Sequence, residues 1–300
     1  MVKPVRIELR GGLGNQLFQY YAGAFLALKH EAELEVDFTH LLSNHENHVL
    51  KSVKDGKDFL SILNLPGKRF VQSRWDFYIE KAARKALERT NYFQNHLLAP
   101  KMFLSSYEPQ SVGFDPQFGE RIYRRVGGYF QTHKYFDYVI EANLDYFPKV
   151  QNPSGWFHET LNKIQEPTAV VVHLREHYPW LSGTFVRCGM EYYGKALDLL
   201  EKELGPLKLI IFGTPDIDVK SYIPSRALEN YEFLSKPENS PDVESLVLMS
   251  KARAIVTANS TFSWWAGRLA TEKQVVIAPQ NVYVNKPNPI DFYPKNWITL

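Results

Sequence analysis

Short apolar segments alternate with amphipathic stretches near the N-terminus. Residues 5–9 predict a strand, residues 10–14 a tight loop and residues 16–29 a helix, followed by a second strand at 34–37. Asn15 stands where its side chain can cap the first turn of this helix. Strands and helices that alternate in this order predict a parallel sheet with crossover helices.

The second half of the chain repeats this alternation more clearly. Predicted strands lie at 169–174, 207–212, 231–234, 254–257 and 275–278, and predicted helices lie between them at 190–204, 216–222, 242–251 and 261–271. This order is typical of a doubly wound α/β domain, whose ligands bind in the loops at the carboxyl ends of the strands.

Two turn-forming segments, at 152–155 and 165–168, bracket a helical stretch between the halves. We place a domain boundary there, which gives domains 1–165 and 166–300. In the irregular middle, residues 79–89 predict a helix with basic side chains on or near one face. A solvated face is the default explanation, and peripheral contact with an anionic membrane surface is the alternative.

Composition narrows the function classes. The chain has 300 residues, and 35 Lys and Arg against 33 Asp and Glu give a net charge of +2, too balanced to favour nucleic acid. One cysteine excludes a disulfide framework and a multi-cysteine metal centre. Without a long apolar run or an N-terminal leader pattern, the sequence leads us to expect a cytoplasmic protein.

A glycine-rich loop, GGLGNQ at 11–16, joins the first strand to the first helix. Glycines let the backbone approach a phosphate or sugar, and a helix N-terminus favours negative charge. Gly12 and Gly14 match part of the dinucleotide pattern G-x-G-x-x-G, and Asp37 is suited to hold a ribose. A structural turn explains the glycines equally well, whereas the adjacent amides Asn15 and Gln16 favour a ligand.

The predicted strand at 169–174 contains His173 near its end, and Arg175 and His177 follow it. Arg175, at the carboxyl end of this strand, is well placed to bind a diphosphate, and a salt bridge at the sheet edge is the structural alternative. His173 and His177 have the i,i+4 spacing of a metal pair, but that spacing joins side chains on helices, and a third ligand is absent nearby. We rank diphosphate binding above metal binding and expect no metal.

The segment ANSTFSWW at 258–265 links a strand to a helix. The hydroxyls of Ser260 and Thr261, together with backbone N–H groups at a helix N-terminus, can form a phosphate cradle. Trp264 and Trp265 are more typical of core packing, and we expect at least one of them to be buried. Asp216 follows another strand and either caps a helix, which is the default, or binds a base or ribose.

These segments resemble the α-1,2-fucosyltransferases, glycosyltransferase family 11. The similarity spans nearly the whole chain and rests on GGLGNQLFQY at 11–20, GYFQ at 128–131, HLR at 173–175, EYY at 191–193, ANSTFSWW at 258–265, and the tail motifs at 278–281, 292–294 and 296–297. It implies a GT-B-like α/β fold with two Rossmann-like domains and a deep interdomain cleft. An acceptor-side domain would precede a nucleotide-sugar domain.

The resemblance also implies an inverting transfer of fucose from GDP-fucose to an oligosaccharide or glycolipid acceptor, at O2 of a terminal galactose, without a metal or cofactor. Arg175 would neutralise the departing diphosphate and His173 would orient it. The implied donor-binding residues are Gly12, Gly14, Asn15, Gln16, Asp216, Asn259, Ser260, Thr261 and Phe262.

The sequence departs from the family where a second arginine and then Gly-Asp-Tyr typically follow His-x-Arg. It has Glu176 and His177 instead, so a positive charge becomes negative. Three explanations of this departure are open: Glu176 points away from the diphosphate, the donor or acceptor differs from that of the family, or the activity is low. Glu176 and His177 are also candidates for the general base. Two other functions remain open: a dinucleotide-dependent oxidoreductase, and a non-catalytic protein that binds a GDP-sugar or glycan.

Overall fold

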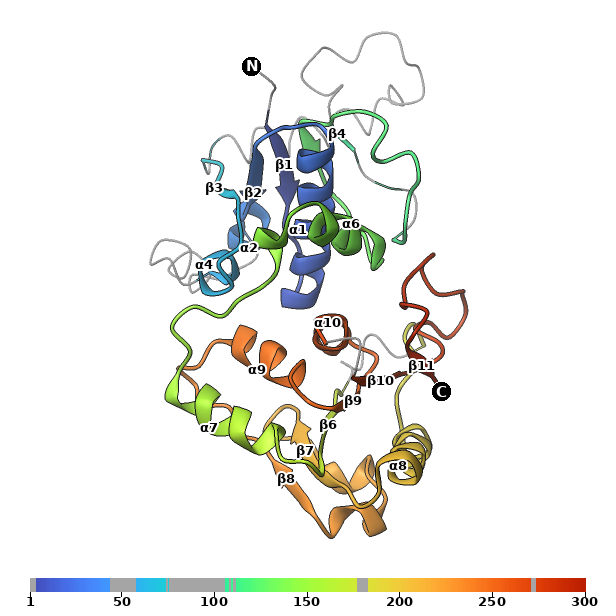
Figure 1. Cartoon of the computed structure of the whole chain (residues 1–300). Coiled ribbons are helices and arrows are strands. Elements are labelled where there is room, and N and C mark those ends of the chain that lie inside the picture. The colour runs from blue at the N-terminus through green and yellow to red at the C-terminus, as the bar shows by residue number, and fades with distance from the viewer. Residues whose placement is uncertain are drawn as a thin grey trace. The chain divides into compact units, whose positions relative to one another are not determined.

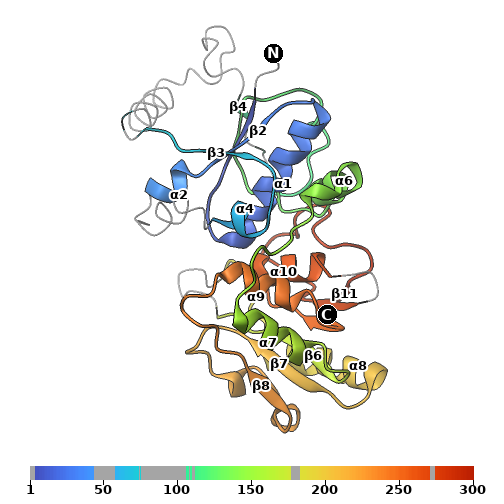
Figure 2. The same ribbon diagram turned by 60° about the vertical axis from the view of Figure 1, so that its left-hand side comes forward.

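The computed structural model describes residues 4–43, 58–73, 75, 106–107, 109, 112–176, 183–270 and 274–300. The chain divides into two compact units, Met1–Lys149 and Val150–Leu300. Each unit contains a parallel sheet with packed helices, as Figures 1 and 2 show from two sides. The strands and helices predicted at both ends of the chain are therefore largely confirmed, and the α/β fold class with them.

The first unit has a sheet in the order β3-β2-β1-β5-β4, in which every pair is parallel. Its strands are β1 (Val5–Glu8), β2 (Leu34–Asp37), β3 (Lys68–Phe70), β4 (Ser106–Tyr107) and β5 (Arg125–Val126). Its helices are α1 (Leu13–Lys29), α2 (Thr39–Ser43), α4 (Phe59–Ile62), α6 (Lys134–Ala142) and the short 3₁₀ helix η2 (Leu144–Tyr146). The sequence order changes direction between β1 and β5, so their carboxyl ends form the switch point of this sheet.

Helix α1 crosses β1 and packs against α6. At the crossing, a Cβ added to Gly23 would lie 2.7 Å from the Ile7 Cβ, so only glycine allows this close approach. The helix begins at Leu13 with Gly12 as its N-cap, and no side chain caps it. The prediction that Asn15 caps α1 is therefore wrong, because the helix begins at Leu13, three residues before the predicted start at Gln16, and Asn15 already lies within the first turn.

The second unit has a parallel sheet in the order β11-β10-β9-β6-β7-β8. Its strands are β6 (Ala169–His173), β7 (Lys208–Phe212), β8 (Tyr231–Phe233), β9 (Ala254–Val256), β10 (Val275–Ala278) and β11 (Ile298–Thr299). Its helices are α7 (Gly155–Ile164), α8 (Met190–Leu204), α9 (Asp242–Met249), α10 (Thr261–Arg268) and the 3₁₀ helices η4 (Val219–Ser221) and η5 (Ser225–Leu228). The switch point lies between β6 and β9.

Alternate residues of the central strands form the core of the second unit. Val170 and Val172 of β6 join a buried cluster that includes Leu197 and Leu200 of α8. The neighbouring Val171 is equally buried on the other side of the strand, so both faces of β6 are covered. This burial explains the continuous apolar run in the sequence.

Helix α7 belongs to the second unit, so the chain divides at 149/150, whereas the sequence places the boundary at 165/166. Ser154 caps α7 and donates from its backbone N and its Oγ to the carboxylate of Glu244 on α9, at 2.8 and 2.6 Å. Glu244 is only 2% exposed. This buried polar contact links the start of α7 to α9 of the second unit.

Two further helix predictions have different outcomes. The predicted helix at 216–222 is wrong; only the single turn η4 forms there, capped by Asp218, whose side chain accepts from the Lys220 N–H. Asp216 lies in the preceding turn, exposed, so the default prediction that it caps a helix is also wrong. The predicted basic helix at 79–89 lies outside the described residues.

Candidate active site

The carboxyl end of β6 places His173 beside the N-terminus of α10, across the switch point of the second sheet, and Arg175 follows two residues later. The His173 ring is 6% exposed and its centroid lies 5.9 Å from that of Phe262, the second residue of α10. The backbone oxygen of His173 accepts from the Tyr193 hydroxyl at 2.9 Å, which fixes the strand end. The geometry thus joins two segments that the sequence separates by almost ninety residues.

His173 is a neutral imidazole in the folded chain. Burial, and secondarily the positive charge of Arg175, lower the pKa of His173 to about 3. Its Nδ1 is buried and has no hydrogen-bond partner among the described residues. A buried polar atom without a partner is uncommon in proteins and is consistent with a ligand that supplies the partner.

The first turn of α10 presents backbone N–H groups that have no acceptor within the helix. Ser260 is the N-cap, and its Oγ accepts from the Phe262 N–H at 3.3 Å. Ser260, Thr261 and Phe262 are all half-buried. With the unpartnered Nδ1 of His173 beside it, this helix end is suited to an anion.

Asn259 holds the loops around this helix end in place. Its Nδ2 donates to the backbone oxygens of Val186 at 2.9 Å and Val282 at 2.7 Å. Both hydrogens of the amide are therefore used within the chain, and only its oxygen is left to accept a hydrogen bond from a ligand. The indole rings of Trp264 and Trp265 are buried, which confirms the expected core role.

Glu176 points toward a basic side chain that the sequence analysis did not single out. Its Oε1 lies 3.9 Å from Nη2 of Arg187, and both side chains are about three-fifths exposed, at 60% and 62%. Arg187 also donates to the Tyr222 hydroxyl at 3.1 Å. The negative charge that departs from the family pattern is thus opposed by a cation from another loop. His177 lies outside the described residues.

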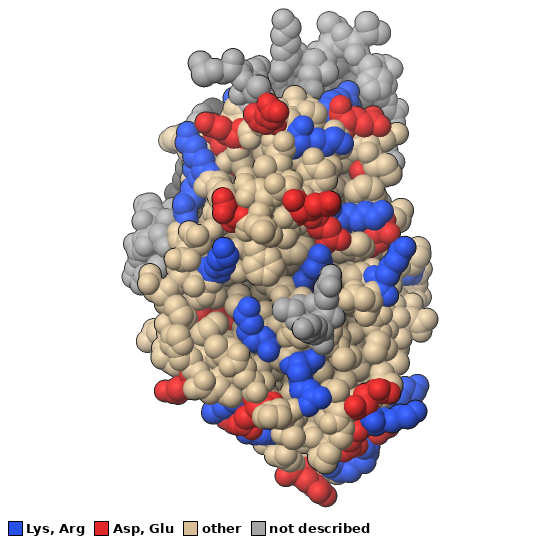
Figure 3. All heavy atoms as spheres, viewed as in Figure 1, with Lys and Arg blue, Asp and Glu red and all other residues tan. Residues whose placement is uncertain are grey.

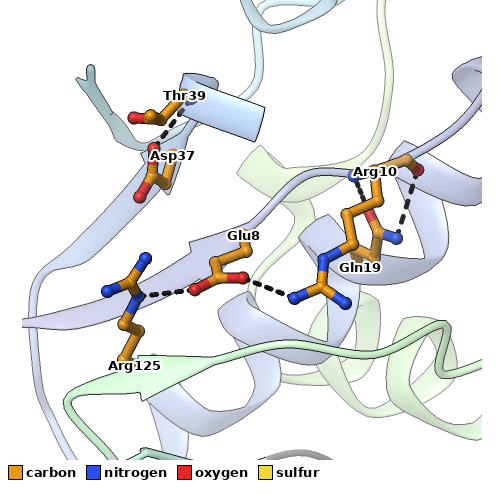
Figure 4. A network of polar contacts seen from close by, with 6 residues as sticks. All are labelled: Glu8, Arg10, Gln19, Asp37, Thr39 and Arg125. Carbon is orange, nitrogen blue, oxygen red and sulfur yellow. Dashed lines mark hydrogen bonds and ion pairs between the residues drawn. The ribbon is translucent and has the colours of Figure 1, made fainter. Parts of the chain in front are cut away.

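In the first unit, a network of polar contacts surrounds the residues just before the glycine-rich loop (Figure 4). Glu8 lies between Arg10 and Arg125 and accepts from both, at 2.8 Å from Arg10 Nη2. Gln19 accepts from the Arg10 backbone N and donates to the Arg10 backbone O, at 2.7 and 3.2 Å. These contacts fix the path of the chain between β1 and α1.

The two amides of the loop also have partners. Asn15 Oδ1 accepts from Gln131 Nε2 at 3.0 Å, and Gln16 Nε2 donates to the Gly11 oxygen at 2.8 Å. Gly12 is exposed and Gly14 is buried. Both of these hydrogen bonds lie within the first unit.

Asp37 ends β2 and is buried. Its Oδ1 accepts from the Thr39 N–H at 2.8 Å (Figure 4), so it shapes the turn into α2. Burial raises the pKa of Asp37, although the bonds with Thr39 oppose this shift.

The titratable groups of the described chain do not gather as a metal site. No group of three His, Cys, Asp or Glu side chains within the described ranges lies close enough to hold an ion. The single cysteine, Cys188, is buried, and burial raises the pKa of its thiol to about 12. On the face seen in Figure 3, the described acidic and basic side chains are interspersed. Of the helices in the part that the structure describes, none is both long and apolar enough to span a membrane.

Comparison with solved structures defines the fold. The chain superposes on a mutant of FUT1 from Arabidopsis thaliana in complex with GDP, with a TM-score of 0.51 and 14% identity, over 94% of this chain and 71% of that one. Its two α/β units have a GT-B-like fold, as the resemblance implied.

Residues 128–300 match the model of glycosyl transferase family 11, and the chain belongs to that family. It is 26% identical to an alpha-1,2-colitosyltransferase of Escherichia coli, over 98% of this chain and 97% of the relative. It is 24% identical to the O-antigen biosynthesis glycosyltransferase WbnK of Escherichia coli, over 97% of this chain and 99% of the relative. The family inferred from the sequence motifs is thus confirmed.

Proposed function

We propose that this glycosyltransferase is inverting and metal-independent, and that it transfers fucose from GDP-fucose to O2 of a terminal galactose on an oligosaccharide or glycolipid. The observation that carries the proposal is the neutral, buried His173, with an unpartnered Nδ1, beside the first turn of α10 and within the electrostatic influence of Arg175. A diphosphate supplies the anion that these groups are suited to bind.

In the proposed reaction, the acceptor oxygen attacks the anomeric carbon and forms the glycosidic bond. The bond from that carbon to the diphosphate oxygen breaks, and GDP leaves with the electron pair. Arg175 and the first-turn N–H groups of α10 stabilise the charge that develops on the diphosphate. His173 donates a hydrogen bond from Nδ1 to a phosphate oxygen, which orients the leaving group.

The acceptor proton passes to a base as the new bond forms. Glu176 and His177 are the candidates on the loop after β6. The contact between Glu176 and Arg187 supports a different task for this carboxylate, which is to balance the charge of that arginine. The remaining donor-side residues, Gly12, Gly14, Asn15 and Gln16 in the first unit and Asp216 in the second, are proposed to contact the donor.

The donor identity has a specific rival. Because one relative is a colitosyltransferase, colitose is the second sugar to test. The test is a screen of GDP-fucose and a colitose donor against galactose-terminated acceptors, with and without EDTA, in which products are identified by mass. It tests the donor sugar, the acceptor and the dependence on a metal together. Tight GDP binding without transfer or donor hydrolysis would indicate a non-catalytic binding protein instead. Membership of a transferase family removes the support for an oxidoreductase.

The Arg175→Ala variant tests the site itself. Loss of one preorganised donor to developing charge costs about 2.7–4 kcal/mol, so we expect transfer to fall about 100- to 1,000-fold with an unchanged circular dichroism spectrum. Arg226→Ala is the matched control, since Arg226 is a half-exposed arginine of the same unit that pairs with Asp198 and Glu201. Near-normal turnover by Arg175→Ala would overturn the proposed role.

A further inference from the structure

The loop after β5, residues 127–131, lies beside the glycine-rich loop at the switch point of the first sheet. β1 and β5 are neighbours in that sheet, and both loops leave its carboxyl edge. Ligands of parallel α/β sheets bind at this kind of position. The loop therefore occupies a place where a substrate is expected, independently of the site in the second unit.

Both ends of the loop lie against residues from the end of β1 to the first turn of α1. At one end, a Cβ on Gly127 would lie 3.3 Å from Arg10 Nη2 and 3.5 Å from Glu8 Oε2, so the backbone approaches this ion pair closely. At the other end, Gln131 donates to Asn15. In the sequence, Tyr129 lies halfway between Gly127 and Gln131.

The backbone around Tyr129 is held in unusual conformations. Gly128 has a φ of +132°, and a Cβ there would lie 2.6 Å from Pro109 Cδ. Phe130 has a φ of +51°, which is uncommon for a residue with a side chain. Its ring is fully buried, with its centroid 5.0 Å from that of Phe118, and this packing offsets the strain.

The result of this arrangement is an exposed aromatic ring on a fixed backbone. Tyr129 is 41% exposed, and it makes no hydrogen bond or ring contact with any residue that the structure describes. Its loop adjoins an amide pair, Asn15 and Gln131, and an ion pair, Arg10 and Glu8. An apolar ring combined with a few fixed polar groups suits a sugar, which has an apolar face and a rim of hydroxyls.

We infer that Tyr129 is a platform for the acceptor sugar, whose apolar face packs on its ring while a hydroxyl bonds the neighbouring amide of Gln131. This inference rests on the proposed function, because it assigns the acceptor of that reaction. It makes Tyr129 a specificity residue that acts on acceptor binding and leaves donor chemistry unaffected.

The test compares Tyr129→Ala and Tyr129→Phe with the wild-type protein. We expect Tyr129→Ala to raise the KM for a galactose-terminated acceptor about tenfold, and Tyr129→Phe to stay near wild type. The KM for GDP-fucose, and hydrolysis of GDP-fucose without acceptor, should not change in either variant. Tyr138→Ala is the control, since Tyr138 is a 40% exposed tyrosine of the same unit, on α6.

An unchanged acceptor KM in Tyr129→Ala would overturn the inference. If Tyr129→Ala also loses donor hydrolysis and thermal stability, Tyr129→Leu, which keeps an apolar side chain, repeats the test. The same parallel loss in Tyr129→Leu would indicate a structural role and overturn the inference. Saturation-transfer NMR with lactose and no donor separates the two proposals. If no GDP-sugar is turned over but lactose binds the wild-type protein and not Tyr129→Ala, the proposed reaction fails while the sugar platform stands. If lactose binds both equally, the platform fails.

Discussion

The buried imidazole of His173 makes the folded chain sensitive to acid. Its pKa is lowered from 6.5 to about 3 in the folded state, so the unfolded chain binds a proton that the folded chain excludes. The free energy of unfolding that depends on His173 is therefore fully present above pH 6.5 and falls as the pH drops from 6.5 toward 3. At pH 5, the loss is about 2 kcal/mol, from 1.5 pH units at ~1.36 kcal/mol each.

The measurement is urea unfolding near pH 7.5 and pH 5, on the wild type and on His173→Asn, which keeps a polar side chain that does not titrate. Five of the six tryptophans lie in Val150–Leu300, so their fluorescence reports mainly on the unit that contains His173. For each protein, the change in the free energy of unfolding between the two pH values is measured. Subtracting the change in His173→Asn from that in the wild type removes the contribution of other titratable groups.

We expect the wild type to lose about 2 kcal/mol more than His173→Asn between these pH values. Equal losses would refute the reasoning, because they would mean that His173 is accessible to protons in the folded chain. GDP should reduce the acid sensitivity of the wild type, since a diphosphate beside the imidazole favours its protonated form.

Two other variants test contacts of the second unit. Glu176→Arg replaces a 60% exposed carboxylate with a cation and is expected to lower the KM for GDP-fucose about two- to fivefold at low salt. Loss of turnover in this variant would instead assign the general base to Glu176. Ser154→Ala removes the cap of α7 and a bond to the buried carboxylate of Glu244, so it should lower the unfolding free energy of the second unit by about 2 kcal/mol, as measured by urea unfolding. Ser154→Thr keeps the hydroxyl and should lose much less; equal losses would show that the hydroxyl is unimportant.

The regular elements were predictable because their apolar patterns are strong. The strand at Leu34–Asp37 and the helix at Met190–Leu204 match the predicted limits. β5 could not be predicted, since Arg125–Val126 is too short for any periodicity and forms only because β1 and β4 flank it. The helix expected at 216–222 does not form, because Asp218 caps only the single turn η4.

The site was predictable in its residue types and less so in its contacts. Motifs indicated His173, Arg175 and the start of α10, and the fold explains why the first and last of these meet. The partners of Glu176 and Asn259 could not be found in this way, because Arg187 and Val282 come from distant loops without a motif of their own. Tyr129 lay inside a family motif, and only its exposure distinguishes it from the buried Phe130.

Strand β11 shields one side of β10 from association with other molecules. Ile277 and Ala278 of β10 pair with Ile298 and Thr299, and Leu300 exchanges backbone hydrogen bonds with Ala278 and Gln280. Removal of the last three residues would expose the N–H and C=O groups of an apolar strand, which is a template for intermolecular sheet growth. Trimmed versions of this chain should therefore precipitate at concentrations that the full-length chain tolerates.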